Sequence, residues 1–371
     1  MLARIQAMWR LLTRTSGFID LTIRVNDTAG GVDTEADLLR WHRENRIPVD
    51  ELIAGIFARH LSDPAAEGTL DVTLDAAPIA LGEGEPYMTT DGFIVQPIEF
   101  PGGDIGSLAV NGTVNDLAVS GASPLYLSLN AFIEEGLEIA TLDRIVASLA
   151  EAARAAGVRV VAGDTKVLPR GEGGGLYLAT TGVGLRPVGL DLGLHRIRPG
   201  DSILVSGPIG DHGIAVLGAR GELGFESNIE SDVAPLNHLV AAMLEASDQI
   251  HVLRDPTRGG LATVCSELAR ATGRGISLEQ SSVPVRDAVI SVCEMLGYDP
   301  LYLACEGRVV AIVDPAQADR VLECWRALPA GRDAAIVGEV ADGRQRVVLV
   351  TELGGERILE ELEDDPLPRI C

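Results

Sequence analysis

The chain has 371 residues, enough for two domains of ordinary size, and hydrophobic residues make up 46% of it. Its formal net charge is −24 at pH 7, with 30 Lys and Arg against 54 Asp and Glu. Nucleic acids and anionic membrane surfaces repel such a charge, so we expect neither as a partner. The sequence also has no apolar run of transmembrane length and no signal-peptide pattern, which favours a cytoplasmic location.

The chain divides into four parts by pattern. Residues 1–45 show no stable periodicity and form an atypical amino-terminal segment. We expect a first domain over 46–187 and a second over 188–345, separated by a join that contains Pro and Gly. Residues 346–371 are expected to form a mobile tail. Because neither half repeats a strict strand–helix–strand order, the predicted fold class is α+β with two domains.

In chain order, the first predicted strand covers 88–95. Asp104 is the expected N-cap of a helix over 104–118, and Gly157 ends a second helix over 142–156. Apolar runs predict the remaining elements as strands over 158–161, 176–184, 202–206, 308–313, 334–340 and 346–350, and helices over 235–246, 260–271 and 287–296.

Acidic side chains stand at or just before several predicted element ends. They are Asp75, Asp91, Asp116 and Asp164, and Asn115 lies beside one of them in a helix of small and apolar residues. A buried carboxylate without a partner is costly, which implies a cation. Mg²⁺ prefers carboxylate oxygens and keeps phosphate oxygens as its other ligands. Each Asp alone is equally well an ordinary cap or turn residue, so both interpretations stay open.

Basic residues at two places suggest contacts to phosphate. Lys166 follows the strand predicted over 158–161, and Thr165 beside it offers a hydroxyl. A lysine acts as a compact point charge on phosphate, although a surface lysine would look the same in the sequence. Arg258 precedes a predicted helix and could clamp a phosphate or carboxylate through two hydrogen bonds.

Three further residues have chemistry that the local sequence leaves ambiguous. Glu306 lies between an apolar run and a strand, where limited solvent access would suit a general base, or it is simply an edge glutamate. His212 is most simply a loop histidine satisfied by its neighbours. Cys371 is the last residue, and it is either a reactive thiol on a movable tail or a frayed end.

Nine short strings occur together in one order, and together they resemble the HypE family of hydrogenase maturation proteins. That family belongs to the superfamily of ATP-using enzymes related to aminoimidazole ribonucleotide synthetase. The resemblance covers roughly residues 50 to 371. The strings are FPGGDIG, GTVND, IEEG, AGDTKV, GDHG, SDVAPL, RDPTRGGLA, EGRVV and the terminal PRIC.

The resemblance implies an activity. A partner carbamoyltransferase, HypF, places a carbamoyl group on the terminal thiol, and the HypE-type protein uses ATP to dehydrate it to an S-cyanide. The cyanide then passes to iron held by a HypC–HypD complex for the active centre of [NiFe] hydrogenase. The resemblance also implies a homodimer built from the first domains.

The family's functional residues carry over by motif. Cys371 would carry the substrate and Lys166 would steady the γ-phosphate together with Thr165, while Glu306 is the candidate base. ATP phosphates and magnesium would be held by Asp75, Asp91, Asn115, Asp116 and Asp164, of which the four aspartates are the expected metal ligands.

The amino end departs from the family pattern. Relatives carry the string HGAGG where this chain reads Leu39-Arg-Trp-His-Arg43, and the usual paired Asp is reduced to Leu74-Asp75. An alternative is therefore a scaffold component of the maturation complex whose nucleotide site is impaired. A related ATP enzyme that acts on a small free substrate would have no need of the terminal PRIC string.

Overall fold

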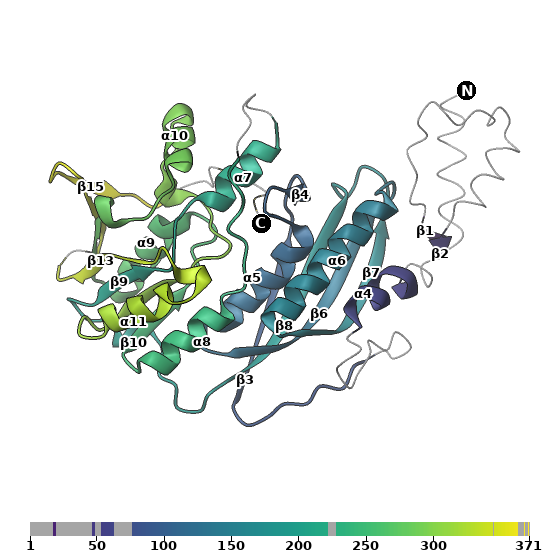
Figure 1. The fold of residues 1–371 in the computed structure, drawn as a ribbon, viewed down its shortest axis with the longest axis horizontal. Coiled ribbons are helices and arrows are strands. Elements are labelled where there is room, and N and C mark those ends of the chain that lie inside the picture. Colours follow the sequence, from purple (N-terminus) through teal and green to yellow (C-terminus); the bar gives the residue numbers. More distant parts are fainter. Residues whose placement is uncertain are drawn as a thin grey trace, which may run out of the picture.

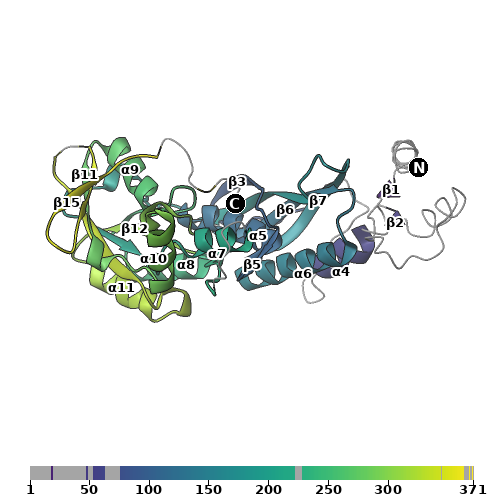
Figure 2. The same ribbon diagram turned by 90° about the horizontal axis from the view of Figure 1, so that it is seen from above.

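The computed structural model describes most of the chain from residue 53 onward. The described residues are 18–19, 47–48, 53–62, 76–221, 228–343, 345–362, 367 and 370. Two domains, each with its own sheet and helices, lie side by side in an elongated molecule (Figures 1 and 2). Within the described residues no helix is long and apolar enough to cross a membrane.

The first domain is built on a four-stranded sheet in the order β3-β8-β6-β7. Buried and less buried side chains alternate along β6 and β8, so one face of the sheet forms the core. α5 packs against β3 and β8, and α6 packs against α5 (Figure 1). The bounds are β3 (Glu85–Phe93), β6 (Ser123–Glu134), β7 (Arg159–Leu168), β8 (Leu176–Arg186), α5 (Ile105–Val119) and α6 (Ile139–Ala156).

The second domain is built on a seven-stranded sheet in the order β10-β12-β9-β13-β11-β14-β15. Its strands are β9 (Ser202–Val205), β10 (Ile250–Arg254), β11 (Gly275–Glu279), β12 (Val310–Val313), β13 (Ala335–Ala341), β14 (Val347–Val350) and β15 (Glu356–Leu359). Its helices are α7 (Asp211–Ala219), α8 (Asn237–Ala246), α9 (Gly260–Thr272), α10 (Asp287–Leu296) and α11 (Ala318–Arg326).

Helices cover both faces of this second sheet. Every residue of β12 is buried, because its alternate side chains enter two different hydrophobic clusters. α9 belongs to one cluster, and α8 and α11 belong to the other. Ala118, near the end of α5, joins the second of these clusters, so α5 connects the two domains.

Short elements complete the fold. They are the pairs β1 (Phe18–Ile19) with β2 (Ile47–Pro48) and β4 (Glu99–Phe100) with β5 (Gly103–Asp104), a π-helix η1 (Ile53–Ala58) followed by α4 (Arg59–Leu61), and the 3₁₀ turns η2 (Leu194–Arg196), η3 (Gln280–Ser282), η4 (Pro300–Tyr302) and η5 (Pro329–Gly331).

The predicted two-domain α+β class is confirmed, with two corrections. Strand β7 runs to Leu168, so Asp164 and Lys166 lie within a strand and not after it. Strands β14 and β15 pair with each other inside the second sheet. The prediction that a mobile tail begins at residue 346 is therefore wrong, because the sheet continues to Leu359. The segment 1–45 lies almost wholly outside the described residues.

A capping box fixes the start of α5. The Asp104 side chain accepts a hydrogen bond from the Ser107 N–H at 2.9 Å, and the Ser107 hydroxyl accepts one from the Asp104 N–H at 3.0 Å. This arrangement satisfies two backbone donors that would otherwise lack partners at the helix terminus.

Loss of this cap should destabilise the first domain. We expect Asp104→Ala to lower the free energy of unfolding by about 1 kcal/mol. Asp104→Asn keeps an acceptor at the same position and should retain the stability. Thermal unfolding of the two variants checks this, and equal losses in both would show that the cap contributes nothing.

Candidate functional site

An acidic cluster forms where the two domains meet. Asp91 lies on β3, Asp116 on α5, and Asp255 directly after β10. Burial raises the pKa of Asp116, and the nearby Asp91 charge raises it further. Burial likewise raises the pKa of Asp255 to about 6, with Asp116 as the largest charge contribution. Asp91 and Asp116 are thus close enough to Asp255 for their charges to act on it, and the three carboxylates share one site.

Glu306 is the most buried carboxylate of this cluster. The residue is only 3% exposed, and its Oε1 has no hydrogen-bond partner among the described residues. Burial raises its pKa well above the ordinary value, and the charges of Asp255 and Asp232 add to the shift. A carboxyl in this state has high proton affinity, which a general base requires.

The main chain of Glu306 is fixed from both domains. Its N–H donates to Asp232 Oδ1 at 3.0 Å, and its carbonyl accepts from Asn115 Nδ2 at 3.1 Å. A Cβ at Gly307 would lie 1.8 Å from the Asp232 carbonyl oxygen, so only glycine fits beside this segment. The backbone that carries the Glu306 side chain is therefore held in place.

Asn115 has a different task from the one predicted. Its buried amide donates to the carbonyls of Ala234 and Glu306, and its Oδ1 accepts from the Leu236 N–H at 2.8 Å. Because these partners occupy the amide, the structure does not support a direct contact with nucleotide. Asn115 instead joins α5 to the second domain and positions Glu306.

Two arginines balance the buried acids behind Glu306. Arg308 lies 3.5 Å from Asp232 and 3.7 Å from Asp211, and Arg286 binds Asp211 at 2.9 Å. The pairing is incomplete, because one oxygen each of Asp211 and Asp232 lacks a hydrogen bond among the described residues. The site thus keeps an excess of negative charge.

Lys166 and Asp164 form a second, more exposed group. Lys166 Nζ contacts Asp164 Oδ2 at 2.6 Å, and Thr165 lies between them on β7. β3, which carries Asp91, is at the opposite edge of the four-stranded sheet. Three strand spacings separate the edges, roughly 14 Å along the sheet. The predicted set is thus divided, and only a ligand of nucleotide size could touch both groups.

The other predicted residues are placed as follows. Arg258 is exposed just before α9, two residues ahead of the helix start. Asp75 and Cys371 lie outside the described residues. Lys166 is also the only lysine in the chain, so arginines make up the rest of the Lys and Arg total.

Two described residues near the end of the chain pack on the second domain. Leu367 and Ile370 are buried, at 3% and 2% exposed, and belong to the hydrophobic cluster that includes Ile214 of α7 and Ala304. The His212 ring contacts the Ile370 carbonyl oxygen at 2.8 Å. The residue that precedes Cys371 is therefore docked on the second domain.

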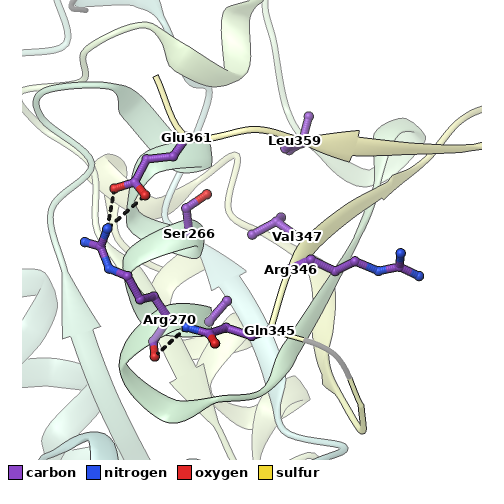
Figure 3. A pocket seen from close by; sticks show the side chains of 8 residues that line it. Ser266, Arg270, Gln345, Arg346, Val347, Leu359 and Glu361 are labelled. Atoms are coloured by element: carbon purple, nitrogen blue, oxygen red, sulfur yellow. Dashed lines mark hydrogen bonds and ion pairs between the residues drawn. The ribbon is translucent and has the colours of Figure 1, made fainter. Parts of the chain in front are cut away.

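A separate pocket lies elsewhere on the second domain. It is formed by α9, β14 and the end of β15, and the Arg270–Glu361 ion pair crosses it (Figure 3). None of the predicted site residues lines it. It is therefore distinct from the acidic cluster.

The acidic cluster suits a hard cation. In the described part of the chain, no three His, Cys, Asp or Glu side chains converge as a complete metal site. Like charges close together nonetheless gain from a divalent cation, and Mg²⁺ takes its remaining ligands from phosphate and water. The residues present fit magnesium bound together with a nucleotide.

Comparison with known proteins agrees with this geometry. Models of the AIR synthase related protein family match residues 74–186 with the N-terminal domain and 198–350 with the C-terminal domain. Carbamoyl dehydratase HypE of Azotobacter vinelandii is 51% identical over 322 residues, which cover 86% of this chain and 93% of that protein. The chain belongs to the HypE family.

Solved HypE structures share the fold described above. A crystal structure of hydrogenase maturation protein HypE in complex with ATP superposes with a TM-score of 0.82 at 45% identity, covering 88% of this chain and 97% of that one. HypE in a crystal structure of the HypE–HypF complex superposes with a TM-score of 0.72 at 46% identity, covering 75% and 90%.

Sequence reasoning missed three residues of the site, although each lies in a string that carried the resemblance. Asp255 precedes the Arg258 that was singled out, and Asp232 lies in SDVAPL. His212 was taken for a loop histidine, but it is fully buried on α7. The signal available was membership of those strings, since Asp255 lies in RDPTRGGLA, Asp232 in SDVAPL and His212 in GDHG.

The raised pKa of Glu306 has a consequence for stability. Above its ordinary pKa of 4.5 the unfolded chain releases this proton while the folded chain keeps it. The free energy of unfolding therefore falls as pH rises, by at most about 1.4 kcal/mol per pH unit, until the folded pKa is passed.

We therefore expect Glu306→Gln to stabilise the protein free of metal and nucleotide, by an amount that grows from pH 5 to pH 8. Thermal unfolding across this range measures it. Glu294→Gln, on an exposed position of α10, is the matched control and should show no such growth. A constant difference between Glu306→Gln and the unaltered protein at all pH values would contradict the argument.

Proposed function

We propose that the protein dehydrates a carbamoyl group on Cys371 to a cyanide at the expense of ATP, as a step of [NiFe] hydrogenase maturation. One observation carries this proposal: Glu306, a buried carboxylate of high proton affinity, and the contact that holds Ile370 share one part of the second domain. The His212 ring contacts the Ile370 carbonyl oxygen, and the next residue, Gly213, donates its N–H to the carbonyl of Ala304, two residues before Glu306. Homologues named carbamoyl dehydratase and the HypE structure in complex with ATP support the same activity.

The proposed chemistry balances in two steps. The carboxamide oxygen first attacks the γ-phosphorus of ATP and releases ADP, which turns a poor leaving group into a good one. Two protons then leave the nitrogen as the C–O bond breaks, one to Glu306 and one to the departing phosphate, giving S–C≡N and inorganic phosphate that retains the carboxamide oxygen. Glu306 must be ionised to accept its proton, which the charge of a bound divalent cation would favour, and its Oε1 has no hydrogen-bond partner among the described residues.

The charges around the site suit phosphoryl transfer. Lys166 would place a compact positive charge on the transferring phosphoryl group, and Thr165 would donate a hydrogen bond to it. Asp91 and Asp116 are the proposed ligands of one magnesium ion, with Asp255 added from the structure and Asp75 from the family motif. Asp164, roughly 14 Å away along the sheet, would hold a second magnesium ion beside Lys166. Magnesium, when bound, would neutralise charge on the ATP phosphates.

The burial of Glu306 also protects the reaction. An activated carboxamide phosphate would hydrolyse if water reached it, so the dehydration requires a site closed to solvent. The 3% exposure of Glu306 supports this requirement. The scaffold alternative is not adopted, because the acidic cluster is assembled in the described residues despite the altered amino end.

The proposed partners follow from the reaction. A HypF-type carbamoyltransferase would load Cys371, in line with the HypE–HypF complex among the solved structures. A HypC–HypD complex carrying iron would receive the cyanide. We also propose a homodimer through the first domains and a cytoplasmic location, which suits a thiol that must stay reduced.

The single lysine makes the nucleotide contact directly testable. An amine-reactive reagent has only one side-chain target, and Lys166 is 62% exposed at its side chain. We expect Mg-ATP to slow modification of Lys166 and to leave modification of the α-amino group unchanged as an internal reference. Equal rates with and without Mg-ATP would remove Lys166 from the nucleotide site.

The corresponding variant separates the two reactions at Cys371. We expect Lys166→Ala to accept the carbamoyl group from the partner but not to dehydrate it, because the phosphoryl transfer loses its point charge. Lys166→Arg keeps the charge in a different geometry and should retain part of the rate. Mass spectrometry of the C-terminal peptide reads both steps, and normal dehydration by Lys166→Ala would contradict the assignment.

A further inference from the structure

Leu367 and Ile370, the described residues at the end of the chain, pack on the second domain. Both are buried in the hydrophobic cluster that includes residues of α7. A Cβ at Gly213 would lie 3.2 Å from Leu303 Cβ and 3.4 Å from Leu367 Cδ1, so a side chain there would crowd Leu303 and touch Leu367. His212, the preceding residue, adds a polar contact to the Ile370 carbonyl oxygen.

The surroundings of His212 fix its tautomer. The Ile370 carbonyl can only accept, so His212 Nε2 carries the hydrogen and donates it at 2.8 Å. The other nitrogen, Nδ1, then accepts from the Ser231 hydroxyl at 2.8 Å. Burial lowers the pKa of His212, which favours this neutral form. The ring is further held edge-on by Phe100, with centroids 5.4 Å apart.

The same short segment that supports His212 also supports Glu306. Ser231 accepts from the Val233 N–H at 3.1 Å, and the intervening Asp232 accepts from the Glu306 N–H at 3.0 Å. Asp232 is close enough to both His212 and Glu306 to raise the pKa of each. Residues 231–233 therefore support both the His212 ring, which contacts Ile370, and the backbone of Glu306.

We propose that His212 is a positioning residue that holds the C-terminal residues docked near the segment that carries Glu306 while the dehydration takes place. The proposal rests on the proposed function for its chemical meaning. It assigns opposite requirements to the two reactions at Cys371. Dehydration needs the docked chain end, whereas loading by a separate carbamoyltransferase needs the same residues to leave His212.

The test uses two substitutions of His212 in the full-length protein. His212→Phe keeps the buried aromatic volume but removes the donor to Ile370. His212→Gln keeps an N–H near the position of Nε2. Arg270→Gln is the control, because it breaks the exposed Arg270–Glu361 ion pair at the start of the C-terminal stretch (Figure 3) without touching His212. Exposed ion pairs contribute little to stability.

The readouts are hydrogen exchange of the C-terminal peptide and the rates of carbamoylation and dehydration at Cys371. We expect His212→Phe to exchange faster and to dehydrate about tenfold more slowly, the effect of a lost buried hydrogen bond. Its carbamoylation rate should be unchanged or higher. A structural defect would slow both reactions, so this opposite response is specific to positioning. His212→Gln should recover most of the dehydration rate, and Arg270→Gln should match the unaltered protein.

Three outcomes would overturn the proposal. They are normal exchange and dehydration in His212→Phe, loss of both reactions in His212→Phe and His212→Gln alike, and a change in Arg270→Gln as large as that in His212→Phe. Failure of the proposed function is distinguishable from these, because the unaltered protein would then fail to dehydrate. The exchange measurement would still show whether His212 holds the chain end.

Discussion

The buried carboxylate of Glu306 is the constraint on which the rest of the site depends. A carboxyl group that is 3% exposed and surrounded by further acids is costly to keep in a folded protein. The structure offsets this cost in part by holding a proton on it and by placing Arg308 behind Asp232. A divalent cation bound at the neighbouring aspartates would favour release of that proton and leave an ionised Glu306, whose high proton affinity is the property that a base in the dehydration requires.

Contacts from both domains hold the backbone that carries Glu306. α5 belongs to the first domain, but Asn115 on it bonds three backbone groups of the second. The second domain contributes Asp232, whose side chain orients Glu306 and whose neighbour Ser231 orients His212. Relative movement of the domains would therefore change the base, the acidic cluster and the dock for the chain end together.

Much of this could be predicted from sequence, because some of the signals are local. The Asp104 cap, Gly157 at the end of α6, and α10 over Asp287–Leu296 follow from residue chemistry and periodicity alone. For Glu306 the local sequence left two interpretations open, a shielded base and an edge glutamate, and the structure decides for burial. The division of the acidic residues into two groups could not be predicted. It depends on the order of the strands in the sheet, and periodicity carries no information about which strands are neighbours.

Two predictions failed to anticipate contacts for different physical reasons. The buried amide of Asn115 implied a partner, and the structure supplies backbone partners from residues more than a hundred positions away, which local sequence cannot indicate. The segment of β15 was interpreted as tail because the end of the chain is rich in Gly, Glu and Pro. It forms a short edge strand with an exposed Ile358, and its pairing with β14 leaves little apolar pattern to recognise.

One measurement tests the central claim most directly. The unaltered protein and Glu306→Gln, each carbamoylated on Cys371, are mixed with Mg-ATP. The mass of the C-terminal peptide is then measured by mass spectrometry. The account predicts that the unaltered protein loses one water from the adduct and that Glu306→Gln keeps the adduct intact. Loss of water at the same rate in both would contradict the role of Glu306.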